Sequence, residues 1–343
     1  MYSFVNDYSE GAHPRILEAL SRANLEQNIG YGEDVHSDMA KEYIKQLIDQ
    51  KDVDIHFIPG GTQTNLLVIS SFLRPHECVI AADTGHINVH ETGAIEATGH
   101  KVVAMPVAEG KLTPEAITKA LEQHSGEHMV KPKMVYLSDT TELGTIYTKE
   151  ELTAIHRLCR EKKLTLFLDG ARLASAMTCR NNDLTLKEIA GLVDVFYIGG
   201  TKNGALLGEA LVICREELKS EFRYLIKQRG AMMAKGFVIG IQFEELFRDK
   251  LYFELAVHAN RMAERIETAL RESGYPFYAT PGTNQLFPVI PNSILEKLSE
   301  NFRFSINEKY DEQHSVIRFV TSWATKEESV ESLCEFFQNN SLL

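Results

Sequence analysis

The stretch LTLFLDGAR at residues 164–172 is an apolar run of strand length that ends in an acid, a glycine and an arginine. A short apolar run bounded by turn residues is typical of a buried strand. Runs of this kind cover residues 55–58, 78–82, 101–105, 134–137, 164–168 and 193–198. Helix-like stretches alternate with them, and those at 113–123 and 148–162 each open on a threonine that can cap a helix. The alternation predicts an α/β fold with a mainly parallel sheet covered by helices on both faces.

The chain of 343 residues is longer than one typical domain, and its pattern changes after about residue 240. A long amphipathic helical region then reaches to about Gly274, and a short pattern of strands and helices follows over residues 285–338. We therefore expect an N-terminal arm over residues 1–14, a large domain over 15–245 and a smaller C-terminal α+β domain over 246–343.

Composition excludes several classes of protein. The 48 acidic and 36 basic residues give a net charge of -12, so no basic excess is present to bind nucleic acid. The longest apolar runs are far shorter than the ~20 residues that cross a bilayer, so we expect no membrane partner. The five cysteines are scattered and form no C-x-x-C pair, which argues against a disulfide framework and a zinc knuckle. We expect a soluble, cytoplasmic protein with reduced thiols.

Three motifs lie where predicted strands end, which is where α/β sheets bind their ligands. The first is PGGTQTN at residues 59–65, directly after a strand and at the start of a helix. Glycines let the backbone approach an anion, and a helix N-terminus offers free N–H groups with a positive partial charge. A phosphate would fit there, although the motif lacks a P-loop lysine and an ordinary capped turn is the alternative.

The second and third motifs supply an acid and an amine. Asp169 follows a buried strand, where a carboxylate stays ionised only beside a cationic partner. Lys202, in GGTKNG at residues 199–204, also follows a strand, where burial can lower the pKa of the amine enough for a Schiff base. Taken singly, a salt bridge to Arg172 and a solvated turn lysine are the ordinary alternatives. Asp169, Lys202 and the glycine motif at residues 59–65, named here the anion cradle, together match an aldehyde cofactor with a phosphate and a ring nitrogen. That cofactor is pyridoxal 5′-phosphate.

With these motifs the chain resembles the low-specificity L-threonine aldolases along its whole length. The resemblance rests on NDYSEG at 6–11, GEDVH at 32–36, GGTQTN at 60–65, GHINVHETG at 85–93, DGARL at 169–173, GTK at 200–202, KQRGA at 227–231 and RFVT at 318–321. These aldolases are pyridoxal phosphate enzymes of the aspartate aminotransferase fold, fold type I, in the aromatic amino acid beta-eliminating lyase and threonine aldolase grouping. The resemblance implies a large domain with a mainly parallel sheet and a smaller C-terminal domain.

The resemblance also implies how the cofactor is held. Lys202 would form the Schiff base, Asp169 would pair with the ring nitrogen, and His86 would stack on the ring, from where it could relay a proton. The other residues implied in cofactor binding are Gly60, Gly61, Thr62, Arg172 and Lys227. Relatives take phosphate contacts from the neighbouring chain, and Lys227 would lie at that interface; a solvated helix face is the alternative.

For the substrate carboxylate, the resemblance implies Arg172 and Arg318, helped by Asn6 where many relatives have a serine. An exposed strand arginine would look the same as Arg318 in sequence. Many of these aldolases carry a second active-site histidine where this chain reads SDTTE at 138–142, and His36 stands where a tyrosine is common. Both positions face the part of the substrate that becomes the aldehyde, so the stereochemical preference and the base stay open, with Glu91 as a candidate base.

The activity that the resemblance implies is cleavage of a β-hydroxy-α-amino acid, L-threonine or L-allo-threonine by default, to glycine and an aldehyde. A beta-eliminating lyase and a phenylserine-type aldolase are alternatives with the same cofactor, and a cofactor-binding homologue without cleavage is an alternative of another class. The complete set of lysine, aspartate and arginine argues against the last. We expect no catalytic metal, although His86 and His90 lie one helical turn apart beside acids.

A homo-oligomer, a dimer or a tetramer, is expected because relatives complete the phosphate site across a two-fold axis. Residues 237–246 offer more apolar surface than one helix face buries within a single lobe. We expect the excess to lie against another subunit or inside the junction of the lobes.

Overall fold

A seven-stranded sheet forms the centre of the larger part of the molecule in the computed structural model, which describes residues 1–343. Its order is β2-β8-β7-β6-β5-β3-β4. The strands are β2 (Asp54–Ile58), β3 (Glu77–Ala82), β4 (Val102–Met105), β5 (Lys131–Ser138), β6 (Thr165–Asp169), β7 (Val195–Gly199) and β8 (Glu209–Ile213). Neighbours from β4 to β7 pair in parallel, whereas β8 runs antiparallel to both β7 and β2. The expected mainly parallel sheet is confirmed, and β8 is the strand that the sequence pattern missed.

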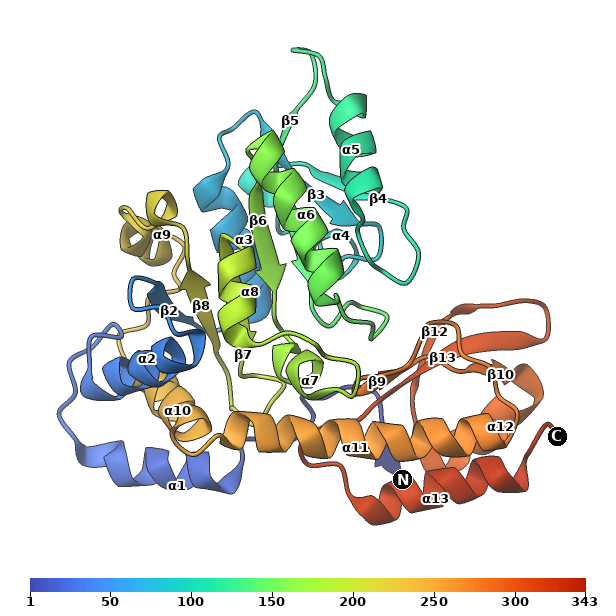
Figure 1. The fold of residues 1–343 in the computed structure, drawn as a ribbon. Helices are drawn as coiled ribbons and strands as arrows, with labels where there is room; N and C mark the ends of the chain where they lie inside the picture. The colour runs from blue at the N-terminus through green and yellow to red at the C-terminus, as the bar shows by residue number, and fades with distance from the viewer.

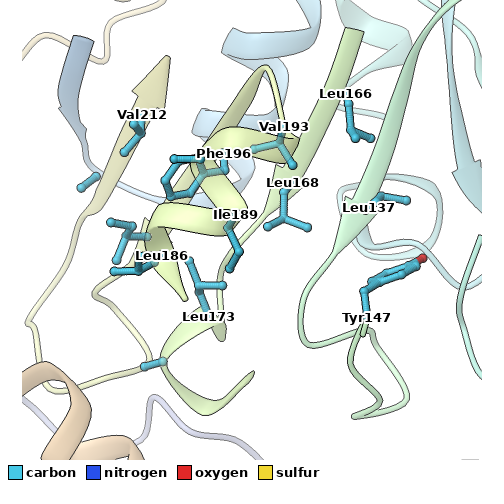
Figure 2. Packing of buried hydrophobic residues seen from close by; sticks show 14 of the residues in the cluster. Leu137, Tyr147, Leu166, Leu168, Leu173, Leu186, Ile189, Val193, Phe196 and Val212 are labelled. Carbon is cyan, nitrogen blue, oxygen red and sulfur yellow. The ribbon is translucent and has the colours of Figure 1, made fainter. Parts of the chain in front are cut away.

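Helices cover both faces of this sheet because successive side chains of its strands point to opposite sides. Leu166 and Leu168 of β6 lie in one core and Phe167 lies in another. The first core is covered by α5 (Pro114–Gln123), α6 (Lys149–Lys162) and α8 (Leu186–Leu192), and the second by α3 (Gly61–Phe72) and α9 (Phe222–Gln228). Figure 2 shows Leu166 and Leu168 on the same side of β6, with Leu168 next to Ile189 of α8. Each such side chain stabilises the fold by roughly 1.5–3 kcal/mol through burial.

The two threonines expected to cap helices do so. Thr113 accepts a hydrogen bond from the backbone N–H of Ala116, at 3.3 Å, at the start of α5. Thr148 forms a capping box with Glu151 at the start of α6, where the Glu151 carboxylate accepts from the N–H of Thr148 at 2.8 Å. These side chains satisfy N–H groups that the helices themselves leave without partners.

A smaller antiparallel sheet lies in the C-terminal part of the chain (Figure 1). It contains β9 (Gln285–Leu286), β10 (Val289–Pro291), β12 (Ser305–Lys309) and β13 (His314–Val320). The helices packed with it are α11 (Leu251–Glu272), α12 (Asn292–Asn301) and α13 (Glu327–Asn339). Residues of α11 up to Ala256 belong to the first core, and those from Met262 onward belong to a separate C-terminal core. The border between the two hydrophobic cores thus falls inside α11. The expected domain boundary at residue 246 stays a prediction.

The N-terminal arm crosses from the small sheet to the large one. Its first strand, β1 (Tyr2–Ser3), pairs in parallel with β11 (Phe302–Arg303), and Phe4 is buried in the C-terminal core. After the arm come α1 (Pro14–Arg22), a 3-10 turn over Ala23–Leu25 and α2 (Val35–Ile48). The arm therefore belongs partly to the C-terminal core and, through Asp7, contacts Arg172 just after β6 of the large sheet.

The helical region expected after residue 240 is two helices rather than one. α10 (Phe237–Arg248) and α11 are separated at Lys250, whose φ of 63° lies in the left-handed region and ends the helical path. Ile239, Phe243 and Leu246 of α10 are buried in the first core, and the helix packs against α1 and α2. The apolar excess of this segment is thus buried within the chain. No helix in the structure is both long and apolar enough to span a membrane.

Candidate active site

The carboxyl ends of β6 and β7 meet closely because glycines stand where they touch. A Cβ on Gly170 would lie 1.9 Å from the carbonyl oxygen of Tyr197, and one on Gly199 would lie 2.4 Å from that of Ala171. A larger residue at either position would push the two chain segments apart. The glycines after Asp169 and before Lys202 therefore let these two residues share one edge of the sheet.

Asp169 is buried, with 4% of its surface exposed, and its carboxylate is held by donors from three elements. Its Oδ2 accepts from the hydroxyl of Tyr136 at 2.5 Å and from Nδ2 of Asn65 at 3.0 Å. Its Oδ1 accepts from the hydroxyl of Tyr197 and from the N–H of Ala171. Burial alone would raise the pKa of Asp169, but the charge of His86 and the tyrosine hydrogen bonds outweigh it and hold the pKa below its ordinary value. The site thus contains a fixed negative charge.

Lys202 lies in a turn after β7 that is anchored on both sides. The N–H of Gly200 and the hydroxyl of Thr201 donate to the Glu209 carboxylate at 2.9 and 2.8 Å, and Asn203 donates to the carbonyl of Tyr252 at 2.7 Å. The Nζ of Lys202 itself has no hydrogen-bond or ion-pair partner, and it lies 5.9 Å from the centre of the Tyr8 ring.

The environment of Lys202 favours its neutral form. Burial and the charge of Arg172 lower the pKa of the amine, against the opposing effect of Asp7 and Asp169. A lysine in this state is a nucleophile, because the unprotonated amine carries the free electron pair.

The start of α3 lies beside the Asp169 pocket. Gly60 is the N-cap of this helix, and no side chain caps it, so its first N–H groups remain free to bind an anion. A Cβ on Gly61 would lie 3.2 Å from the hydroxyl of Tyr197, the same hydroxyl that donates to Asp169. Thr62 is exposed at the mouth of this cradle. The glycine pair therefore lets a free helix N-terminus approach the acid.

A buried relay of hydrogen bonds links Asp169 to His86, the first residue of α4 (His86–Val89). Nδ2 of Asn65 donates to both Asp169 and Glu91, at 3.0 and 2.8 Å. The same Glu91 oxygen lies 2.7 Å from Nδ1 of His86. The side chain of Glu91 has no exposed surface, whereas that of His86 is 33% exposed. The imidazole is thus fixed in orientation, with Nε2 left free.

These groups fit pyridoxal 5′-phosphate. The uncapped start of α3 matches a phosphate, ionised Asp169 matches a protonated ring nitrogen, and the partnerless amine of Lys202 matches an aldehyde. His86 offers a partly exposed aromatic ring next to this set. When bound, this cofactor withdraws electrons from the α-carbon of an amino acid.

Arg172 lies near Lys202 and Arg318 lies near Arg172, and the two arginines differ in what they contact. Arg172 donates from Nε and Nη2 to the carboxylate of Asp7, at 2.7 and 3.0 Å, and Asn284 donates to Asp7 at 2.9 Å. Arg318 donates from Nη2 to the carbonyl of Val5 at 3.2 Å, and its buried Nε has no partner. An unpaired buried donor is costly, so Arg318 is the arginine available for a ligand carboxylate. Nε and Nη2 of Arg172 are bound to Asp7 of the arm, so only Nη1 remains for a ligand carboxylate.

The remaining residues predicted for the site differ in what they contact. The side chain of Asn6 accepts from the N–H of Tyr8 and the hydroxyl of Ser9, at 2.9 and 3.0 Å, which shapes the arm just before Asp7. Lys227 is exposed, with Nζ 4.7 Å from the centre of the Tyr31 ring, and it makes no hydrogen bond or ion pair with the residues above. His36 lies between the carboxylates of Glu244 and Glu26, at 2.6 and 2.8 Å, on the face of α2 that meets α10.

Several residues of the site were missed from the sequence. They are Asp7, Asn65, Tyr136, Glu142 and Tyr197. Asn65 was the easiest of these to predict, because it lies at the end of the glycine motif at residues 59–65. The tyrosines lie in the middle of apolar strands, and nothing in their sequence context distinguishes them from core residues.

Comparison with known proteins agrees with this geometry. A family model described as beta-eliminating lyase matches residues 6–292. The chain is 31% identical over 340 residues to the low specificity L-threonine aldolase of Pseudomonas sp. (strain NCIMB 10558), covering 96% of this chain and 95% of that protein. The structure of Leishmania major threonine aldolase matches with a TM-score of 0.98 at 50% identity and 99% coverage of both chains.

A more distant likeness shows the fold alone. The aspartate aminotransferase of Thermus thermophilus matches with a TM-score of 0.74 at 15% identity, covering 99% of this chain and 91% of that chain. The architecture is therefore that of fold type I, as expected. The chain belongs to the beta-eliminating lyase family, in its threonine aldolase group, and is a carbon–carbon lyase with pyridoxal 5′-phosphate as its cofactor.

Proposed function

We propose that the enzyme cleaves L-threonine and L-allo-threonine to glycine and acetaldehyde. The observation that carries this proposal is the partnerless amine of Lys202 near ionised Asp169, together with the Arg318 guanidinium, whose buried Nε has no partner. Together they provide groups for a cofactor aldehyde, its ring nitrogen and a substrate carboxylate. Relatives named for threonine aldolase activity support the choice of substrate class.

In this proposal each residue has one task. Lys202 holds the cofactor through its amine, and Asp169 holds the proton of the ring nitrogen, which keeps the ring able to accept negative charge. The N–H groups at Gly61 and Thr62 bind the phosphate after Gly60 has turned the chain. His86 covers the ring, and Glu91 fixes the orientation of His86 rather than touching the substrate, because the Glu91 side chain has no exposed surface.

The substrate carboxylate is bound by Arg318 and by the remaining Nη1 of Arg172, with Asn6 shaping the arm that brings Asp7 to Arg172. Bidentate binding fixes the amino acid so that the bond to be cleaved has one orientation. The pair of Asp7 and Arg172 acts as a rigid wall of this pocket.

An assay with purified holoenzyme tests the function. L-threonine and L-allo-threonine are incubated separately, and glycine and acetaldehyde are measured in equal amounts if the proposal is correct. L-phenylserine tests the phenylserine-type alternative, since it would release benzaldehyde. Pyruvate and ammonia from an amino acid with a leaving group at Cβ, without glycine from threonine, would show a beta-eliminating lyase instead.

Replacement of Arg318 by alanine is expected to raise KM for L-threonine by roughly 10²-fold, because a buried charge-assisted pair is worth about 2–5 kcal/mol. The reason is loss of a largely buried guanidinium near Arg172 whose Nε has no partner in the protein. Steady-state kinetics check it, with Arg303→Ala on the exposed edge strand β11 as the matched control. An unchanged KM in the Arg318 variant would move the carboxylate site to Arg172.

We further propose that the enzyme works as a homodimer, or as a tetramer of two dimers, in which Lys227 contributes to the phosphate site. Support comes from the exposed apolar residues of the region around α2, which include Leu25, Ile29, Val35 and Met39. The loop after α9 also lies next to the cradle, since Gln63 donates to the carbonyl of Arg229 at 3.3 Å.

Activity per chain is expected to fall as the protein is diluted below its dissociation constant, because the phosphate site then lacks the second chain. Light scattering and activity measured on the same dilution series check this. A monomer of 38.7 kDa with full specific activity would refute the shared site while leaving Lys202 unaffected. A cytoplasmic location is also proposed, since all five cysteines are free thiols.

A further inference from the structure

His90 follows the last residue of α4 and places a second imidazole beside that of His86. The two ring centres are 5.4 Å apart, with an angle of 55° between the planes. The ring nitrogens of His90 make no hydrogen bond with any protein group, and the residue is exposed. It is therefore an imidazole with both nitrogens available to a ligand.

The charges that act most strongly on the His90 ring are cationic. They are His86 on its own helix, Arg318 on β13, Lys202 in the turn after β7 and Arg172 before α7 (Leu173–Thr178). Burial and these charges lower the pKa of His90. The carboxylate of the adjacent Glu91 is directed to His86 and Asn65 instead. The lowered pKa favours the neutral imidazole, in which one ring nitrogen carries a free electron pair.

We propose that His90 accepts the proton of the substrate β-hydroxyl during cleavage. The inference rests on the proposed aldol cleavage and names the base that the reaction requires. The neighbours of His90 include the two arginines proposed to bind the substrate carboxylate and Lys202, which is proposed to hold the cofactor, so the proposed site places the amino acid next to the His90 ring. A second imidazole near the substrate replaces the histidine that this chain lacks at residues 138–142.

The other candidate bases are already engaged. Glu91 has no exposed surface and accepts two hydrogen bonds. Glu142 accepts from the hydroxyl of Ser138 at 2.7 Å and from the N–H of His86 at 2.8 Å, and burial raises its pKa. His86 is fixed by Glu91 in the place assigned to ring stacking. His90 is exposed, and neither of its ring nitrogens has a hydrogen-bond partner in the protein.

The step balances in electrons and protons. The O–H bond breaks and its electron pair forms the second C–O bond of the aldehyde, while the electron pair of the Cα–Cβ bond stays with the amino acid fragment. The hydroxyl proton moves to His90, and Cα of the fragment takes up one proton in its place to give glycine. Because the strongest nearby charges are cationic and disfavour the protonated ring, His90 passes its proton readily to solvent.

The test compares His90→Asn and His90→Phe with wild-type holoenzyme, and His128→Asn on an exposed loop is the matched control. We expect kcat for L-threonine to fall by about 10²–10⁴-fold in both His90 variants, the usual contribution of a general base, with KM nearly unchanged. The acidic limb of the wild-type pH profile of kcat/KM should disappear, and added imidazole should restore part of the rate of His90→Asn.

A second readout does not depend on turnover. The imidazole proton resonance that is lost in His90→Asn should titrate in the wild type with a pKa below that of free histidine, and glycine should shift it. If the wild type forms aldehyde and the His90 variants retain its kcat and its acidic limb, the assignment is wrong. A resonance with a raised pKa would also contradict it. A wild type that forms no aldehyde would overturn the proposed function itself, and the inference with it.

Discussion

Replacing Lys202 by alanine is expected to abolish the covalent link to pyridoxal phosphate and to lower kcat by more than about 10³-fold, as loss of a covalent catalyst does. The physical reason is the state of this amine, which has no hydrogen-bond or ion-pair partner and a lowered pKa because of burial and Arg172. The variant should lose the visible absorption band of the linked cofactor. Borohydride reduction followed by peptide mass analysis measures the link directly.

Lys119→Ala is the matched control, because Lys119 lies exposed on α5 and makes no ion pair. It should keep both the absorption band and the activity. Recovery of a reduced cofactor on a different lysine of the Lys202 variant, at wild-type yield, would show that the turn after β7 is not the attachment point. The fold is expected to persist, since Gly200, Thr201 and Asn203 anchor this turn without help from the lysine.

Asp169→Asn is expected to lower kcat by roughly 10²–10³-fold, because removal of one partner of a buried charge pair costs about 3–5 kcal/mol. The amide keeps the shape of the side chain but cannot hold a proton on a ring nitrogen. Four donors surround the carboxylate in the wild type, so the charge is fixed where the ring nitrogen would be. The variant should also bind pyridoxal phosphate more weakly, which equilibrium dialysis measures.

Asp194→Asn provides a control with similar burial. Asp194 precedes β7, at the end of the sheet opposite to Asp169, and accepts from the N–H of Leu166 at 2.8 Å. That substitution should lower the thermal midpoint while leaving kcat and the affinity for the cofactor unchanged. If Asp169→Asn turned over substrate at the wild-type rate, the residue would be structural, and its four hydrogen bonds would serve only to close the pocket.

Local sequence patterns predicted most of the elements of this fold. The apolar run that ends at Asp169 is β6, and the two capped helices begin at the threonines that mark them. The pattern was less informative where a feature depends on one backbone angle or on which strands pair in the sheet. The left-handed turn at Lys250 divides the long helical region, and β8 follows the lysine turn as an antiparallel neighbour.

The sequence by itself determined the chemistry that the chain carries: an acid and an amine at strand ends, a glycine-rich helix start and a late arginine. Tertiary structure decided which of these meet and what each contacts. Asp7 reaches Arg172 and Asn284 across 165 and 277 positions of sequence, and it occupies the arginine that the sequence assigned to substrate. Local periodicity encodes which face of an element is buried but not the order of strands in the sheet, so contacts between distant segments appear only once the cores are packed.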